Sequence, residues 1–216
     1  YNTLKKTKPV IVRNKKPKSE YLPAQTIEKI FKLLSCAFGQ AVKWELVGKN
    51  PFKLSDALPK IKYKKRDIWD AETINKALKE CRDGKLYVAI NLAFACSMRE
   101  GEILGLTWNN VHITDEDIAS DNAYLEIKQE LTRASKRALE QLDQKDVYYI
   151  FPPLMPNTST RVVLKKPKTD SSIRKVYIPS SVAILLAELR EEQNETIEAL
   201  GDMYENYNLV MATSDG

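Results

Sequence analysis

The sequence predicts a mainly α-helical protein with a small antiparallel β-sheet, that is, an α+β fold. Apolar residues recur at helical spacing over much of the 216-residue chain, which indicates amphipathic helices. Strand-like patterns appear only between about residues 124 and 178, where short β-branched and aromatic runs alternate with polar turns. Hydrophobic residues make up 43% of the chain, so a protein of this length can bury a substantial core.

Charge is distributed unevenly along the chain, although its net value is only +5. Residues 1–66 hold 17 lysines and arginines against 4 acidic residues; by difference, residues 67–216 hold 17 against 25, so the net charges are +13 and −8. A basic module joined to a mildly acidic one is typical of proteins that hold a polyanion such as DNA. The three cysteines form no disulfide or metal spacing, which favours a reducing intracellular compartment, and no apolar run is long enough for a membrane span.

In the basic part, a helical pattern runs from Pro23, at the first helical position, to Val47, and ends at Gly48 and Asn50-Pro51. Three lysines lie off its apolar stripe, and we expect them to contact a DNA backbone, although a solvated helix face would also explain each one: Lys29, Lys32 and Lys43. A linker follows at residues 59–67, whose basic residues are expected to contribute salt-dependent DNA affinity. They are Lys60, Lys62, Lys64, Lys65 and Arg66.

Three helices are predicted next. Asp70 caps the first, which runs through Cys81 and is stopped by Gly84. Residues 86–96 are apolar on nearly every side, which indicates a core helix. The third helix begins at Arg99 after a sharp break and is expected to bury three apolar residues: Ile103, Leu104 and Trp108.

Arg99 therefore starts a helix, where unpaired amides and the helix dipole favour an anion. A guanidinium fixed there can donate two hydrogen bonds to one phosphate. We interpret Arg99 as a candidate DNA phosphate ligand, although arginines also begin many ordinary surface helices.

Strand-like patterns fill the chain up to residue 178. One strand is predicted at about residues 124–131. Residues 132–160 combine a short helix-like piece, an aromatic run and a proline-rich turn. Two further strands, at about residues 162–164 and 176–178, flank a polar turn and are predicted to pair as a β-hairpin.

A last helix is predicted from about Ser181 to Asn194. Three of its apolar residues are expected to face inward: Ile184, Leu185 and Leu189. Three glutamates indicate a solvated face and not a metal site: Glu188, Glu191 and Glu192. No cluster of carboxylates elsewhere suggests a metal-dependent nuclease, so no metal is expected.

Two separated motifs resemble those of one enzyme family. The stretch from Arg99 to Trp108 resembles the first arginine box of the tyrosine recombinases, the phage-integrase family, and residues 167–179 resemble that family's lysine hairpin. Residues 24–51 resemble the end of its core-binding domain, in the style of integrases from temperate phages and conjugative transposons. The resemblance implies three parts. Residues 1–58 are part of a helical core-binding domain, and residues 59–67 are an interdomain linker. Residues 68–216 are the N-terminal part of a catalytic domain, with an insertion at residues 132–160.

The resemblance implies a reaction without metal or cofactor. In the family, a tyrosine hydroxyl attacks the scissile DNA phosphate, which gives a 3′-phosphotyrosyl link and a free 5′-hydroxyl. Arg99 matches an arginine that stabilises charge on the non-bridging oxygens, and Lys168 matches the lysine that protonates the leaving 5′ oxygen. Glu102 matches an acidic position to which we assign the orientation of the active-site cations. Arg174 matches a hairpin arginine, to which we assign positioning or a phosphate contact.

Three features depart from the family pattern. Ser97 stands where many members have glycine before the arginine box. The gap between Arg99 and Lys168 is longer than usual, and we assign the surplus to the insertion, which we expect to touch DNA or a neighbouring subunit. After Lys168, neither the His-x-x-Arg box nor the nucleophilic tyrosine of the family is present.

The histidine and the C-terminal tyrosines that the chain does contain do not match the missing residues. His112, the only histidine, is interpreted as structural. Tyr204 and Tyr207 precede the point where the second arginine box should occur, so neither is expected to be the nucleophile. Because residues 209–216 resemble the segment that leads to that box, and the chain begins at Tyr1, we expect it to be truncated at both ends.

Two alternatives remain open at this stage: a non-catalytic DNA-binding protein on the recombinase scaffold, and a type IB topoisomerase-like enzyme. The basic linker and the N-terminal module argue against the topoisomerase. By family analogy, the partners are double-stranded DNA at recombination sites, further copies in a tetramer, and accessory DNA-bending or excision factors. The same analogy places the protein in the bacterial cytoplasm, at the nucleoid when bound, where it integrates or excises a mobile element.

Overall fold

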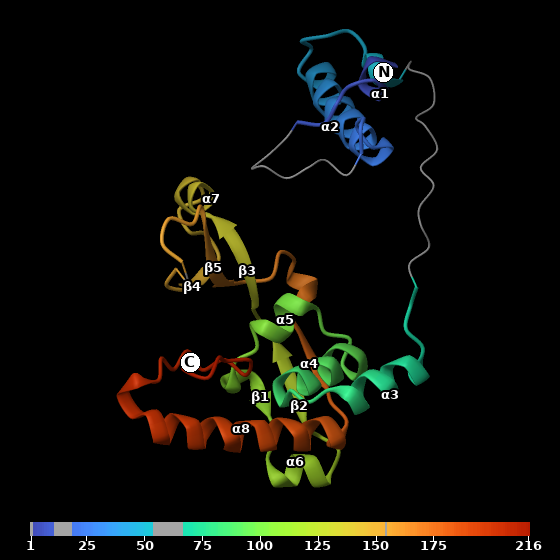
Figure 1. The fold of residues 1–216 in the computed structure, drawn as a ribbon. Coiled ribbons are helices and arrows are strands. Elements are labelled where there is room, and N and C mark those ends of the chain that lie inside the picture. Colours follow the sequence, from blue (N-terminus) through green and yellow to red (C-terminus); the bar gives the residue numbers. More distant parts are fainter. Residues whose placement is uncertain (1, 11–18, 54–66, 154) are drawn as a thin grey trace. The chain divides into compact units, whose positions relative to one another are not determined.

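The computed structural model describes residues 2–10, 19–53, 67–153 and 155–216. The chain divides into two compact units, Tyr1–Ile68 and Trp69–Gly216 (Figure 1). The basic residues of the predicted linker lie outside the described ranges, so their DNA contacts stay predictions: Lys60, Lys62, Lys64, Lys65 and Arg66.

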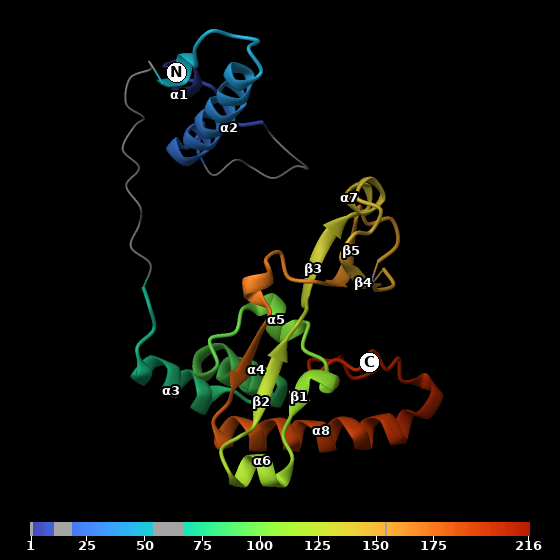
Figure 2. The same cartoon turned by 180° about the vertical axis from the view of Figure 1, so that it is seen from behind.

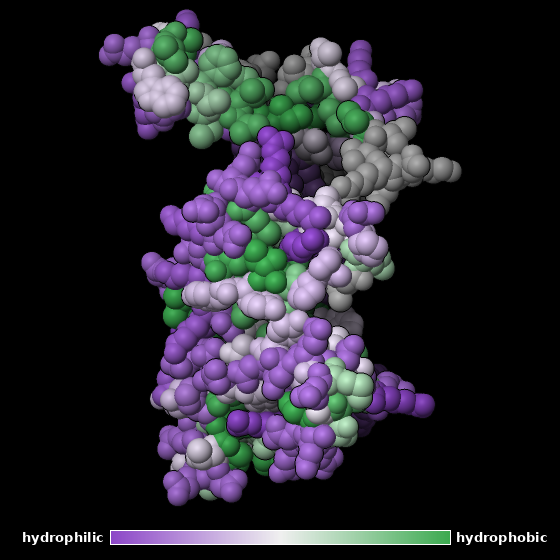
Figure 3. Space-filling model, turned by 90° about the vertical axis from the view of Figure 1, so that its left-hand side faces the viewer, coloured by the Kyte–Doolittle hydropathy of each residue, from purple (hydrophilic) through white to green (hydrophobic). Residues whose placement is uncertain are grey.

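The described residues of the N-terminal unit form one long helix and two short helical turns: α2 (Ala24–Lys43), α1 (Asn2–Lys5) and η1 (Pro51–Lys53). The Phe52 ring closes on Phe31 and Phe38, with ring centroids 5.4 Å apart in both pairs. Asn50 fixes this turn, because its side chain donates to Ser35 O at 2.9 Å and accepts from the Phe52 amide at 2.9 Å. Figure 3 shows that hydrophobic side chains gather on one side of this unit.

Helix α2 differs from the prediction at both ends. Pro23 precedes it as the N-cap in extended conformation, and so does not occupy the first helical position. The helix ends at Lys43 and does not reach Val47. Glu45 adopts a left-handed φ of 58°, and the amides of residues 44–46 bond back to carbonyls of the last turn, so the backbone has already turned before Gly48.

The C-terminal unit is α+β, which confirms the predicted fold class. Its helices are α3 (Ala71–Glu80), α4 (Gly84–Ala95), α5 (Glu100–Leu104), α6 (Asp115–Ala119), α7 (Lys136–Gln141) and α8 (Ser180–Leu200), with the 3-10 turns η2 (Trp108–Asn110), η3 (Asp170–Ser172) and η4 (Gly201–Met203). Its strands are β1 (Val111–His112), β2 (Tyr124–Ile127), β3 (Glu130–Ser135), β4 (Val147–Ile150), β5 (Thr160–Lys165) and β6 (Arg174–Tyr177).

These strands form two separate antiparallel sheets, in the orders β1-β2-β6 and β3-β5-β4. Figure 2 shows β2 continuing into β3, so the single strand predicted at residues 124–131 is divided between the sheets. The predicted hairpin is wrong. Strand β5 pairs with β3 on one edge and β4 on the other, which leaves no free edge, and β6 pairs with β2 instead. We call β3-β5-β4 with α7 the insertion sheet, because it lies within the predicted insertion and its flanks.

The main core lies among α4, α8 and the β1-β2-β6 sheet. Four of its residues have 0% exposure: Leu92, Leu125, Ala183 and Leu186. Helix α4 belongs to the core, as predicted, through Val88 and Leu92, but Leu86 and Phe94 are 54% and 51% exposed, so it is not buried on every side. Asp70 caps α3 as predicted, accepting from the Thr73 amide at 2.8 Å. Gly84 does not stop α3, which ends at Glu80; it begins α4 after Asp83 as N-cap.

Helix α8 continues to Leu200, beyond the predicted end. Ile184 is 47% exposed and not inward; the buried face consists of Val182, Ala183, Leu186, Leu189 and Gln193. The three predicted glutamates are exposed, and the described residues contain no group of metal-binding side chains. Within the same ranges, no helix is long and apolar enough to cross a membrane.

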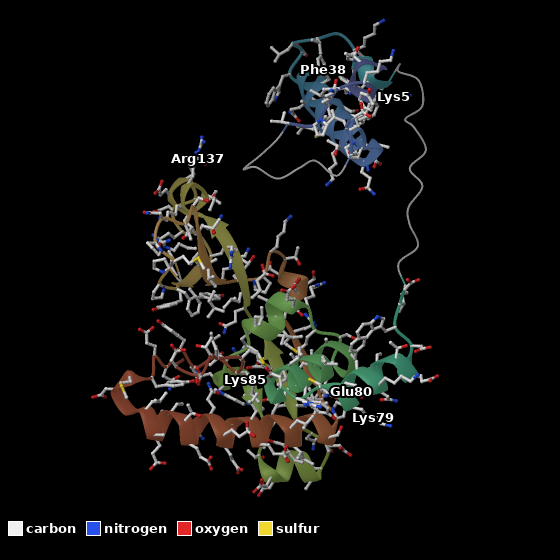
Figure 4. The ribbon with its side chains drawn as sticks, viewed as in Figure 1. Lys5, Phe38, Lys79, Glu80, Lys85 and Arg137 are labelled. Atoms are coloured by element: carbon white, nitrogen blue, oxygen red, sulfur yellow. The ribbon has the colours of Figure 1, made fainter. Side chains whose placement is uncertain are left out.

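The C-terminal segment returns to the core beside the arginine box. Gln193, 8% exposed, accepts from Trp108 Nε1 at 2.6 Å and donates to the Tyr204 hydroxyl and to Leu209 O. Lys85 in α4 donates to Ala212 O at 2.6 Å and points toward that segment in Figure 4. These bonds connect residues far apart in the sequence through buried or half-buried polar groups.

Two glycines allow α5 to pack directly on the insertion sheet. A Cβ at Gly105 would lie 2.6 Å from Leu131 N, and a Cβ at Gly101 would lie 3.0 Å from Leu131 O. Gln129 ties the two elements together, because its Nε2 donates to Gly105 O and Thr107 Oγ1, both at 3.0 Å. Any side chain at Gly105 must therefore displace backbone.

We predict that Gly105→Ala destabilises the C-terminal unit by about 2 kcal/mol, because overpacking against backbone forces a main-chain shift. Chemical denaturation of the protein measures this. Gly84→Ala is the matched control: nothing lies within 4 Å of its Cβ position, and alanine at the start of α4 should leave stability unchanged or slightly raised. Equal effects of the two variants would contradict the proposed packing.

Candidate functional site

Arg99 lies at the break between α4 and α5. Ser97 adopts a left-handed φ of 51°, and the amides of Cys96 and Met98 both donate to Leu92 O. Cys96 and Met98 are each 6% exposed, so the backbone on this side of Arg99 is anchored in the core, while the Arg99 side chain is 71% exposed. Arg99 is the N-cap of α5.

The start of α5 is a weaker anion site than the sequence predicted. Helix α5 is only five residues long, so few peptide dipoles add, and the Arg99 amide is bonded to the Glu102 carboxylate at 3.0 Å. The position of Arg99 is set by Glu102 instead.

Glu102 is the buried centre of the candidate site, with 2% exposure. Besides the Arg99 amide, its carboxylate accepts from Arg99 Nη1 at 2.8 Å, Arg174 Nη1 at 2.9 Å and Arg174 Nη2 at 2.8 Å. Burial by itself would raise the pKa of Glu102. The hydrogen bonds from Arg174 and Arg99 outweigh this and lower the pKa to about 2, so the carboxylate stays ionised at neutral pH.

Arg174 connects this centre to the loop that holds Lys168. Its side chain is 30% exposed, and Nη1 also donates to Ser172 O at 3.2 Å. The loop is ordered by the Lys166–Asp170 ion pair at 2.8 Å and by hydroxyl contacts of Thr169. Lys168 itself is exposed and makes no side-chain hydrogen bond or ion pair within the described ranges.

A cleft of about 520 Å³ opens beside Arg99, between α5 and β3. It is lined by Arg99, Glu100, Gly101, Leu104, Glu130, Leu131, Thr132, Arg133 and Val162. Leu104, predicted to be buried, is 37% exposed because it lies on this wall. Sequence reasoning missed Arg133: it placed an insertion here but had no signal for which side chain would face Arg99.

The predicted DNA-contact lysines of α2 are all exposed: Lys29, Lys32 and Lys43. Lys32 forms an ion pair with Glu28 at 2.7 Å, so part of its charge is compensated within the helix. Their role stays a prediction.

His112 and the two tyrosines have other contacts. The His112 ring stacks on Tyr124 with centroids 4.2 Å apart, which fits a structural role. Tyr204 is 7% exposed, and its hydroxyl accepts from Gln193. Tyr207 packs on Tyr149 and Phe151, and its hydroxyl donates to Glu205 at 2.5 Å, which raises the pKa of Tyr207 above its usual range.

The lowered pKa of Glu102 predicts a pH dependence of folding. Its folded pKa of about 2 lies below the usual value of 4.5, so its contribution to stability is complete above pH 4.5 and is lost as pH falls toward 2. The loss amounts to roughly 3 kcal/mol. Urea denaturation between these pH values should show it in the wild type and not in Glu102→Gln; the surface control Glu188→Gln should behave like the wild type. An unchanged pH profile in Glu102→Gln would contradict the assignment.

Comparison with known proteins gives the following matches. No family model matches the chain. A XerC-like tyrosine recombinase of Caldanaerobacter subterraneus subsp. tengcongensis is 27% identical over 188 residues, which is 85% of this chain and 42% of that protein. Among solved structures, the Tn1549 transposon integrase in complex with a circular-intermediate DNA matches 90% of this chain and 53% of its own, at 18% identity and a TM-score of 0.59. The same integrase with transposon right-end DNA gives 19% identity and a TM-score of 0.59.

The chain spans about half the length of these proteins, with 42% and 53% coverage. At such low identity, the structural matches establish the fold alone. The chain is thus similar in sequence to a XerC-like tyrosine recombinase, and its fold resembles that of the Tn1549 transposon integrase.

Proposed function

We propose that this chain is part of a site-specific DNA recombinase that cleaves and rejoins DNA through a 3′-phosphotyrosyl intermediate. The observation that carries the proposal is the buried Glu102 carboxylate, which holds Arg99 on one side and Arg174 on the other. Through Arg174 it connects the anchored arginine box to the Lys168 loop. These bonds support the proposal, because they join residues from both stretches that resemble the family's motifs.

In this proposal, Arg99 binds the scissile phosphate. Only its Nη1 and its backbone amide are bonded to Glu102, so further N–H donors of the exposed guanidinium can form a forked pair with a phosphate. As a nucleophile attacks, charge builds on the non-bridging oxygens, and a prepositioned guanidinium stabilises it without reorganisation. With Arg99 stabilising this charge, the reaction needs no metal ion to do so.

Lys168 is proposed as the general acid for the leaving 5′ oxygen. A lysine ammonium carries its proton at neutral pH and can give it to an alkoxide as the P–O bond breaks. An exposed side chain on a short polar loop can reach a bound DNA strand. Arg174 positions Glu102 and the loop, and we favour this role over a direct phosphate contact because its two terminal nitrogens are already engaged.

We assign the nucleophile to neither Tyr204 nor Tyr207. The Tyr204 hydroxyl lies in the core, and the Tyr207 hydroxyl is held by Glu205 with a raised pKa, which disfavours the phenolate. The second candidate is a DNA-binding protein that keeps the recombinase scaffold and does no chemistry.

The proposed partner is double-stranded DNA, because the structural neighbours are integrases in complex with DNA. The basic N-terminal unit would serve as part of a core-binding domain and residues 59–67 as the linker. By the same relationship we propose a tetramer at synapsis, accessory DNA-bending or excision factors, a bacterial cytoplasmic location, and integration or excision of a mobile element.

Trapping of a covalent complex on nicked site DNA by the full-length protein tests the function. Arg99→Ala should lower the cleavage rate by about 100- to 1,000-fold, because it removes a charge-stabilising donor, while DNA affinity changes far less. The exposed arginine of the α3–α4 turn supplies the control: Arg82→Ala should cleave normally. Failure of the wild type to form any covalent complex would favour a non-catalytic DNA-binding protein on the recombinase scaffold.

Lys168 has its own test. Lys168→Ala should cleave ordinary DNA about 100-fold more slowly, because the leaving oxygen loses its proton donor. A substrate with sulfur at the bridging 5′ position should restore the rate, since a thiolate leaves without a proton. Cleavage rates on the two substrates measure this, and an equal defect on both would contradict the general-acid role.

A further inference from the structure

A second arginine lines the same cleft as Arg99. Arg133 lies in β3, in the predicted insertion, and its side chain reaches the cleft of about 520 Å³ between α5 and β3. It is exposed, and it makes no hydrogen bond or ion pair with any other residue that the structure describes. An arginine that faces a cleft without a protein partner keeps all its donors available for a ligand.

The strand register explains why Arg133 faces this way. Arg133 pairs with Val162 and Leu131 pairs with Leu164, so these residues share one face of the insertion sheet, since alternate residues of a strand point to the same side. Leu131 and Val162 line the cleft as well. Arg161 pairs with Ala134 and belongs to the opposite face by the same alternation.

The spacing between the two arginines is set by backbone contact. Gly105 and Gly101 bring α5 against Leu131 at the start of β3, so the wall with Arg99 and the wall with Arg133 are held by main chain. A site whose two cations stand on directly packed elements is preorganised for its ligand.

The hollow also continues along the sheet. Val162 lines three hollows, of about 520, 340 and 150 Å³; Arg133 lines the first and the last, and Arg161 lines the last as well. An extended polyanion fits such a surface better than a small anion, because successive phosphates can meet cations at different points along it.

Two acidic residues line the cleft and oppose an anion. Glu130 is paired with Lys165 at 3.3 Å. Glu100 is exposed and has no ion-pair partner within the described ranges. Its charge should therefore weaken binding of a polyanion in the native protein.

We propose that Arg133 is a second phosphate contact, so that α5 and the insertion sheet hold one DNA strand between Arg99 and Arg133. The inference rests on the proposed function and deepens it, because the insertion then forms one wall of the active-site cleft. A phosphate contact carries no base specificity, so Arg133 should contribute to all DNA sequences alike.

The test is binding of the full-length protein to a labelled mixed-sequence duplex at several salt concentrations. Arg133→Ala should lower affinity about tenfold and reduce the salt slope by about one, because one fewer counterion is released. Arg133→Lys should recover part of the affinity, because the charge returns without the forked donors. Glu100→Gln should act in the opposite direction and strengthen binding.

Arg137 provides the matched control. It lies in α7 of the same insertion, is exposed, and points away from the body of the C-terminal unit in Figure 4. Arg137→Ala should change affinity less than twofold, and all variants should melt like the wild type. Unchanged binding in Arg133→Ala, or an equal loss in Arg137→Ala, overturns the inference.

Covalent trapping on nicked site DNA separates this inference from the proposed function. If the wild type binds duplex DNA but forms no covalent complex, the recombinase proposal fails, while the Arg133 contact is still decided by affinity. If the wild type cleaves and Arg133→Ala both cleaves and binds equally well, the function stands and the Arg133 contact fails.

Discussion

The carboxylate of Glu102 carries a full charge at 2% exposure, and such burial is costly unless the charge is paired and hydrogen-bonded. Four donors satisfy it: the amide and Nη1 of Arg99, and both terminal nitrogens of Arg174. The start of α5, the position of β6 and the end of the Lys168 loop are all fixed by these bonds. Loss of any one partner would leave a buried charge incompletely paired, so the three residues are expected to act as a unit.

The backbone of the arginine box is constrained as strongly as its charges. Ser97 occupies a left-handed conformation, with φ of 51°, which costs a non-glycine residue on the order of 1 kcal/mol or more. Glycine, which the resemblance to the arginine box led us to expect at this position, would adopt this conformation without strain. At Gly105 the constraint is contact, since a Cβ would lie 2.6 Å from Leu131 N. Ser97 and Gly105 thus meet two separate physical demands, one on backbone conformation and one on space.

Local signals made most of the fold predictable, and non-local pairing made the rest unpredictable. The helix after Asp70 could be predicted because an N-cap side chain bonds to an amide only three residues later. Arg99 and Lys168 could be found because each lies in a recognisable motif. The hairpin prediction failed because the partner of β6 is β2, some fifty residues earlier, and no local pattern specifies that choice. Arg133 was missed for the same reason: its place in the cleft depends on which face of β3 meets α5. The Glu102–Arg174 bond, too, links residues that only the fold brings together.

The distribution of charge within the bonded network bears directly on phosphate binding. A carboxylate paired only with Arg99 would neutralise the cation that the proposed reaction needs. Arg174 prevents this, because its two hydrogen bonds of 2.9 and 2.8 Å take up much of the negative charge of Glu102. The three side chains together carry a net charge of about +1, and the 71% exposure of Arg99 places that charge toward the cleft. Glu102 can therefore fix the direction of the Arg99 guanidinium without cancelling its charge, which is what a site that stabilises a growing anion requires.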